Sequence, residues 1–151
     1  MAAADDCTVR ARMEGLAEAI EFVEAFCSDR GVAESDGLRL SLVLEELFTN
    51  TVVHGHGGGS DAPVRIKLRV GGSHVELSYE DNAPPFDPLD HLAKSPLDPA
   101  AEVPDRPIGH LGIPLIVNMA DRISYRREDG CNRIRLALRR EASLSTPAGP
   151  A

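Results

Sequence analysis

The sequence lacks the features that mark secreted and membrane proteins. No run approaches the roughly 18–20 apolar residues of a membrane span. The N-terminus MAAADDCTVR contains two aspartates and no apolar core, so it does not resemble a signal peptide. The three cysteines, Cys7, Cys27 and Cys131, match neither a disulfide framework nor a zinc site in their spacing. We therefore expect a cytoplasmic protein whose cysteines are ordinary buried side chains.

Basic residues are also in the minority, with 16 Lys and Arg against 24 Asp and Glu and a formal net charge of −8. A negative field argues against nucleic acid or an anionic membrane as the main partner, and it leaves a basic protein partner open. The 151 residues correspond to one domain, which buries enough surface to form a core without disulfides. We therefore expect no direct contact with nucleic acid or membrane.

The spacing of apolar residues predicts both strands and helices. Alternation predicts strands at 7–13, 64–70, 74–79, 123–127 and 132–138, whereas helical spacing predicts helices at 15–30, from Ser35 or Asp36 to His54, and from Ile113. Gly71-Gly72 and Asp129-Gly130 mark two hairpin turns. Because strands joined in hairpins cannot all be parallel, the pattern predicts an α+β two-layer sandwich, with a mainly antiparallel mixed sheet and about three helices on one face.

The expected boundaries follow from composition. We predict a single domain over residues 1–140, with a frayed start at 2–6 and a disordered tail over 141–151. Residues 81–106 are rich in proline and form an unusually long loop for a compact domain. Such loops are commonly functional lids or disordered segments.

Three groups of residues are candidates for chemistry. Glu46 and Asn50 lie one turn apart and share a helix face, and Asn is disfavoured inside a helix; the alternative is a polar stripe that faces water. Asp81 ends a strand, where its carboxylate can accept a hydrogen bond from a purine amino group or simply start a turn. Gly109 and Gly112 open a helix whose first amides can bind an anion, although glycines also serve any tight loop.

Taken in this order, the three groups resemble the signature motifs of GHKL-type ATPases. Leu44-Glu-Glu-Leu-Phe-Thr-Asn50, with Val53-His-Gly55, is similar to their N-box. Asp81-Asn-Ala-Pro-Pro-Phe-Asp-Pro88 is similar to their first glycine box, and Gly109-His-Leu-Gly-Ile-Pro-Leu-Ile116 to the second. The resemblance covers residues 14–138. The short chain and the Pro-Phe-Asp-Pro sequence are most similar to bacterial anti-sigma factor serine-protein kinases, which have the histidine-kinase-like ATPase fold.

The resemblance implies ATP or ADP and Mg²⁺ as ligands. Asn50 would hold Mg²⁺, which prefers oxygen ligands, and Glu46 would be the catalytic base. Asp81 would bind the adenine amino group, and residues 84–108 would form the ATP lid. The backbone at Gly109, Leu111 and Gly112 would face the phosphates. The remaining implied nucleotide-binding positions are His54, Ala83, Pro85, Phe86, His110 and Ile113.

The resemblance also implies a function. The protein would be an ATP-binding anti-sigma-type regulator with serine/threonine-protein kinase activity that phosphorylates an anti-anti-sigma-type partner. A sigma factor would be a competing partner, and a homodimer is common in the family. The alternatives are a non-catalytic nucleotide-binding module that sequesters its partner, the ATPase module of a histidine kinase, or a relic of the fold without nucleotide.

Two positions depart from the family pattern: His110 stands where the family often has Gly or Arg, and the other lies in the first glycine box. The first glycine box usually has glycine two residues after its aspartate, but Ala83 stands there. Ala does not adopt positive φ as readily as glycine, so we expect an altered loop geometry at this point. Glu46 favours the kinase over the binding module, because a module that only binds has no need of a base.

Overall fold

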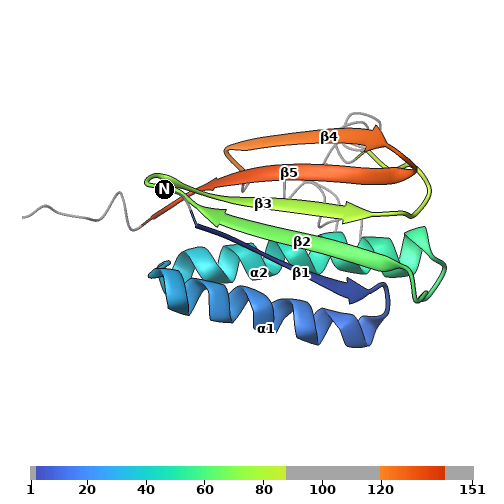
Figure 1. Cartoon of the computed structure of the whole chain (residues 1–151), viewed down its shortest axis with the longest axis horizontal. Helices are drawn as coiled ribbons and strands as arrows, with labels where there is room; N and C mark the ends of the chain where they lie inside the picture. Colours follow the sequence, from blue (N-terminus) through green and yellow to red (C-terminus); the bar gives the residue numbers. More distant parts are fainter. Residues whose placement is uncertain (1–2, 88–119, 142–151) are drawn as a thin grey trace, which may run out of the picture.

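The structure is a computed structural model that describes residues 3–87 and 120–141 (Figure 1). The chain forms β1 (Ala3–Arg10), α1 (Met13–Arg30), α2 (Glu34–Thr49) and a π-helical turn, η1 (Asn50–Gly55). Two hairpins follow, first β2 (Pro63–Val70) with β3 (His74–Asp81), then β4 (Arg122–Glu128) with β5 (Cys131–Arg139). Both hairpins lie where the alternating runs and the two glycine-containing turns predict them.

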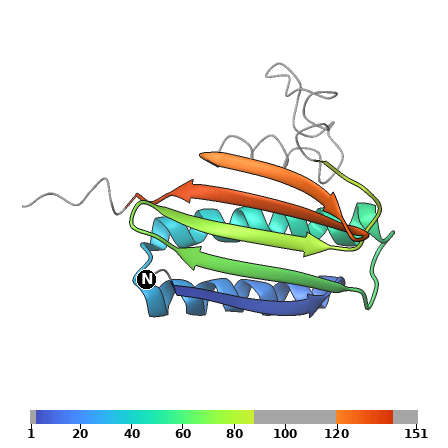
Figure 2. The ribbon, with the colours of Figure 1, turned by 45° about the horizontal axis from the view of Figure 1, so that its top comes forward.

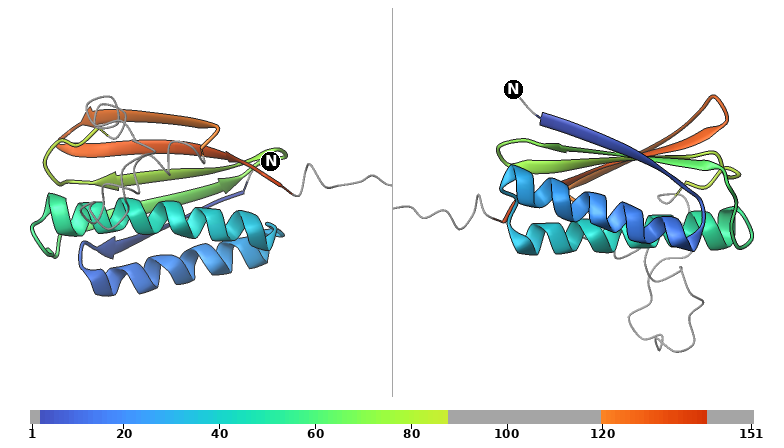
Figure 3. Two further views of the ribbon diagram at one scale, coloured as in Figure 1. Left: turned by 180° about the vertical axis from the view of Figure 1, so that it is seen from behind. Right: turned by 60° about the horizontal axis from the view of Figure 1, so that its bottom comes forward.

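The strands form one sheet in the order β1-β2-β3-β5-β4, and every neighbouring pair is antiparallel (Figure 2). Both helices cover the same face of this sheet, while no helix or strand of the described residues covers its other face, called the open face below (Figure 3). This arrangement confirms the α+β two-layer class. Two α-helices are present in the described residues instead of about three, and the third helix, predicted from Ile113, lies outside them.

The start of the chain differs from the prediction. Strand β1 begins at Ala3 and pairs with β2 along its length, from Ala3 opposite Val70 to Arg10 opposite Pro63. The expected frayed start was therefore wrong for residues 3–6. The predicted strand end at residue 13 was also wrong, because α1 already begins at Met13.

The helix boundaries are set by local contacts. Gly31 ends α1 as predicted, since it adopts a φ of 68° and its amide bonds to the carbonyl of Cys27. Helix α2 begins at Glu34 without a side-chain cap, so neither Ser35 nor Asp36 caps it. Asp36 instead is 2% exposed inside the first turn, where it accepts hydrogen bonds from Arg39 (2.7 Å) and from the amide of Glu141 (3.0 Å).

The core lies between the helices and the sheet. Most inward strand positions are apolar, as in the buried series Val64, Ile66 and Leu68 of β2, and the helices add large side chains such as Phe26 and Phe48. Each fully buried side chain of this size contributes about 1.5–3 kcal/mol. Within the described residues, no helix combines the length and the apolar character that crossing a membrane requires. The core thus fixes α2 against β3, and the end of both elements carries the polar residues described next.

Candidate functional site

A pocket of about 110 Å³ lies where the end of α2 and the turn η1 meet the end of β3. It brings together six of the predicted nucleotide-binding residues, which are far apart in the sequence: Asn50, His54, Asp81, Ala83, Pro85 and Phe86. Glu46 lies one helical turn before Asn50, outside the lining. Gly109, His110, Leu111, Gly112 and Ile113 lie outside the described residues. This cavity is smaller than the roughly 300 Å³ and more of typical ligand pockets, so it fits part of a nucleotide.

Asp81 is the acceptor at the base of this pocket. It is 6% exposed, and its carboxylate accepts hydrogen bonds from the Thr51 hydroxyl (2.7 Å), the Asn132 amide (2.8 Å) and the backbone N–H of Ala83 (3.1 Å). No Lys or Arg among the described residues forms an ion pair with it. A carboxylate offers about four lone-pair positions, so these three donors leave one acceptor position for a ligand.

The Tyr79 hydroxyl and the Leu47 carbonyl hold Thr51 against Asp81. The Tyr79 hydroxyl lies 2.6 Å from the Thr51 oxygen, and the Thr51 oxygen also lies 3.0 Å from the carbonyl of Leu47. Burial raises the pKa of Tyr79 well above its ordinary value, so its hydroxyl stays protonated and donates to Thr51. Thr51 then donates its own proton to Asp81, so a hydroxyl group serves as one of the hydrogen-bond donors to this buried carboxylate.

The helix widens at this point. The sequence predicts a continuous helix to His54, but α2 ends at Thr49 and the backbone continues as the π-helical turn η1. Its wider spacing appears in the bond from the His56 N–H to the Thr51 carbonyl (2.9 Å). Thr side chains that bond back to the preceding turn disturb helices, and π-turns occur frequently at functional sites. Thr51 is therefore the residue that links the widening to the pocket.

Asn132 of β5 is a second residue that the motifs do not contain. Its side-chain N–H groups donate to Asp81, to the Pro84 carbonyl (3.0 Å) and to the Ala83 carbonyl (3.2 Å). Its oxygen accepts from the Tyr125 hydroxyl (2.6 Å) and from the backbone N–H of Phe86 (3.1 Å). Asn132 is 2% exposed. It thus fixes both the carboxylate and the chain that leaves β3.

A signal for Asn132 was present in the sequence. Inward positions of β5 are otherwise apolar, at Ile134, Leu136 and Leu138. A buried amide in such a series requires partners, and this requirement identifies Asn132 as part of a polar site.

Ala83 departs from the motif without strain. Asp129 is the only described residue other than glycine with positive φ, so Ala83 does not adopt the backbone conformation that favours glycine. Ala83 is 3% exposed, and a Cβ added to Gly55 would lie only 2.7 Å from its methyl group. The methyl group of Ala83 therefore fits beside residue 55 because residue 55 is glycine and has no Cβ.

Glu46 and Asn50 form the outer edge of the site. Both are half-buried, and burial raises the pKa of Glu46, with a smaller contribution from the charge of Glu45. A raised pKa brings a carboxyl group closer to the range that suits a general base. In the described part of the chain, no group of three His, Cys, Asp or Glu residues forms a metal site. A single amide oxygen at Asn50 suits Mg²⁺ that is mainly bound by phosphates and water.

Comparisons with known proteins agree with this fold. A chain of the SiaB-SiaC complex from Pseudomonas aeruginosa has a TM-score of 0.55 and 14% identity over 89% of both chains, which shows a common fold. Among curated proteins, none matches the sequence significantly. The family model described as a histidine kinase-like ATPase domain matches residues 9–138. The chain therefore belongs to the histidine kinase-like ATPase family, as the N-box and glycine-box resemblance indicates.

Proposed function

We propose that the protein is an ATP-binding, anti-sigma-type regulator that phosphorylates a serine or threonine of an anti-anti-sigma-type partner protein. The observation that carries the nucleotide part is Asp81. A buried carboxylate with one acceptor position left, and no cation to neutralise it, is suited to a neutral donor such as the amino group of adenine. A phosphate would be repelled there, so the base enters the pocket and the phosphates lie toward Asn50.

Different residues of the chain have different roles in phosphoryl transfer. Asn50 offers an amide oxygen to Mg²⁺, and Mg-ATP supplies the phosphoryl group when bound. Glu46, one turn away, accepts the proton of the attacking hydroxyl, and its raised pKa is consistent with that role. The predicted phosphate-binding backbone at Gly109, Leu111 and Gly112 completes the proposal. Catalysis of this kind depends mostly on positioning and charge neutralisation, which agrees with so few polar groups.

The regulatory part rests on resemblance. The motifs are most similar to anti-sigma factor serine-protein kinases, and one chain of similar fold comes from a complex of two proteins, SiaB and SiaC. Both observations support a protein partner as the substrate. A sigma factor that competes with this substrate is the second proposed partner.

The test separates binding from transfer. Saturating Mg-ATP at about 100 times its Kd adds about 2.7 kcal/mol to stability, or roughly 5–11 °C in Tm for a domain of this size. We expect this shift for the native chain and a much smaller one for Asp81→Asn and Asn50→Ala. Asp61→Asn makes the same chemical change at an exposed carboxylate far from the pocket, so it should keep the full shift.

Phosphoryl transfer is measured separately, with an anti-anti-sigma-type domain and mass spectrometry of its serine and threonine residues. Glu46→Gln should keep the ATP-induced Tm shift and lose most of the transfer. If ATP shifts the native chain and no phosphorylated residue appears, the protein is a nucleotide-binding module that acts by sequestration. If ATP and ADP shift nothing, the nucleotide assignment fails.

A further inference from the structure

The open face of the sheet is basic, although the chain as a whole is acidic. Outward positions of the strands alternate with the buried ones, and many of them carry cations. These are Arg65, Lys67 and Arg69 on β2, Arg133 and Arg135 on β5, and Arg122 and Arg126 on β4. The outward side chains of β3 between them include two carboxylates, Glu76 and Glu80. We call this surface the basic sheet face.

Several of these cations are not neutralised. Glu76 lies 4.0 Å from Arg69, and Arg133 is bound by Glu80 (3.0 Å) and by Glu128 (2.6 Å). No ion pair within residues 3–87 and 120–141 involves Lys67, Arg122 or Arg135. Arg126 also stands directly opposite Arg133 across the β4–β5 pair. Glu128 lies 3.9 Å from Arg126 and 2.6 Å from Arg133, so it bridges these two like charges, which would otherwise destabilise the sheet.

The register aligns donors in a row across four strands. Lys67 is opposite Ser78, Ser78 is opposite Arg135, and Arg135 is opposite Ser124. Lys67 and Arg135 thus alternate with two hydroxyl groups, and Asp6 of β1 stands opposite Lys67 at the end of the row. Arginine and serine side chains together suit carboxylates, because the guanidinium group binds two oxygens at once and hydroxyls add further donors.

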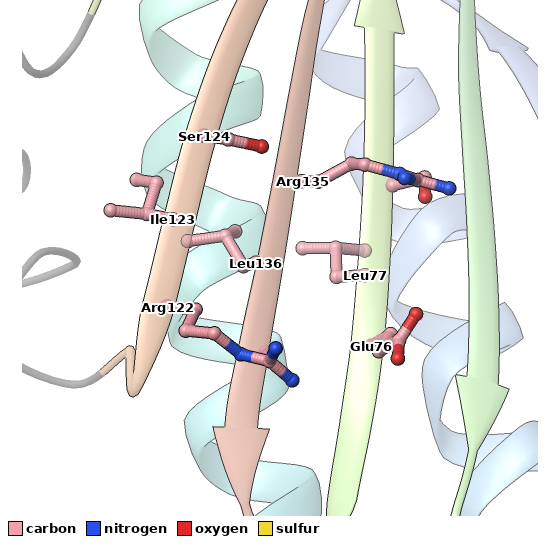
Figure 4. A pocket seen from close by; sticks show the side chains of 9 residues that line it. Glu76, Leu77, Arg122, Ile123, Ser124, Arg135 and Leu136 are labelled. Carbon is pink, nitrogen blue, oxygen red and sulfur yellow. The ribbon is translucent and has the colours of Figure 1, made fainter.

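The face is hollowed where this row lies. One hollow of about 430 Å³ is lined by Glu76, Arg122, Ser124 and Arg135, and Figure 4 shows these side chains in front of the strands with the helices behind. A second hollow of about 660 Å³ extends toward β2. The two hollows have Ser78, Ser124 and Arg135 in common, so they form one continuous surface.

The charges favour an acidic protein over a nucleic acid. Proteins that bind single strands use aromatic side chains on which bases stack, but Tyr79 and Tyr125 both point inward to the core. The net charge of −8 repels a long polyanion, and four carboxylates, Asp6, Glu76, Glu80 and Glu128, interrupt the basic sheet face. A protein surface with a few acidic residues contacts the cations without approaching the rest of the molecule.

We propose that the basic sheet face is a docking surface for an acidic region of a partner protein, with carboxylates bound by Lys67, Arg122 and Arg135. The surface lies on the open side of the sheet, away from α2 and the Asp81 pocket, so it is separate from the proposed nucleotide site. Net charge alone leaves a basic protein partner open, whereas the basic sheet face suits an acidic one.

The test uses the full chain and a short fluorescein-labelled peptide that contains only a few glutamates, followed by fluorescence anisotropy at low and at physiological salt. We expect saturable, salt-sensitive binding that Arg135→Glu weakens by at least about tenfold. Arg12→Glu changes the net charge equally at an exposed position outside the basic sheet face, and it should leave the affinity nearly unchanged. Arg135 is exposed, so its substitution is not expected to disturb folding.

Three results would overturn the proposal. The first is no saturable binding at low salt, or an equal loss in Arg12→Glu, which would show only a general charge effect. The second is tighter binding of an oligothymidylate of the same length at equal salt, which would indicate a nucleic-acid surface. The third is salt-sensitive self-association without peptide that Arg135→Glu abolishes, which would indicate a second copy of the chain as the occupant.

Discussion

Gly55→Ala is the substitution that tests the close packing of the pocket most directly. A Cβ at residue 55 would lie 2.7 Å from the Cβ of Ala83, well inside the 3.4–4 Å of ordinary contact. Neither methyl group can turn away, so the backbone of η1 or of the segment after β3 must move. Overpacking of this kind costs about 1–3 kcal/mol, which corresponds to a Tm lower by roughly 2–12 °C.

A second substitution, Ala83→Gly, tests whether the cost of Gly55→Ala comes from the contact between residues 55 and 83. By itself it removes a buried methyl group, worth about 0.8 kcal/mol, and adds up to about 1 kcal/mol of chain flexibility. In the double variant the methyl group of residue 55 occupies the space that residue 83 has left. The double variant should therefore be more stable than Gly55→Ala alone, although two losses would ordinarily add.

Differential scanning calorimetry of the native chain and the three variants measures this coupling. An unchanged Tm for Gly55→Ala would show that the two segments are farther apart than the structure places them. Strict additivity would show that residues 55 and 83 do not contact each other. Either result would remove the physical reason for glycine at residue 55.

Three further predictions concern the surrounding network. Asn132→Ala leaves buried backbone groups unpaired, which costs about 1–3 kcal/mol each, and it should lower both the Tm and the ATP affinity by calorimetry. Glu45→Gln removes a like charge and lowers the pKa of Glu46, so the acid limb of the pH–rate profile should move to lower pH; an unmoved limb would contradict Glu46 as the base. Asp36→Ala removes the carboxylate that accepts a hydrogen bond from the Glu141 amide and should lower the Tm in thermal unfolding. An equal Tm would show that this contact does not contribute to stability.

The carboxyl group of Glu46 also determines the direction in which stability changes with pH. The pKa of Glu46 is higher in the folded chain than in the unfolded one. The folded state therefore binds this proton more tightly, and stability falls as pH rises through the interval between the two values. Glu45→Gln narrows that interval, so the variant should lose less stability than the native chain over the same pH range.

The fold was predictable from the sequence because its signals are local. Alternation of apolar residues identified both hairpins, and Gly31 marked the end of α1. The errors arose where a contact with a residue distant in the sequence determines the local structure. Residues 3–6 look like a loose end, but β2 pairs with them. Asp36 looks like a cap, but the amide of Glu141, more than one hundred residues later, holds it inside the domain.

The candidate site divides in the same way. Asn50 and Asp81 were identifiable because motifs carry them, whereas Thr51 and Asn132 act through a network that only the tertiary structure assembles. The consequence of Ala83 was also not readable from the sequence. Whether a loop position accepts alanine depends on the space beside it. At residue 83 that space exists because residue 55 is glycine.

The distribution of charge connects the two proposed surfaces. Net charge suggests one uniform acidic molecule, but the strand register gathers cations on the open side of the sheet, while Glu14, Glu18 and Glu21 are exposed on α1. No cation of residues 3–87 and 120–141 pairs with Asp81, and Glu45 and Glu46 are close to the proposed phosphate end of the pocket. Phosphates there would meet like charge, so ATP binding on the helix side should depend on Mg²⁺, whereas an acidic protein on the basic sheet face needs no metal. Chelation of Mg²⁺ should therefore weaken the first interaction and leave the second unchanged.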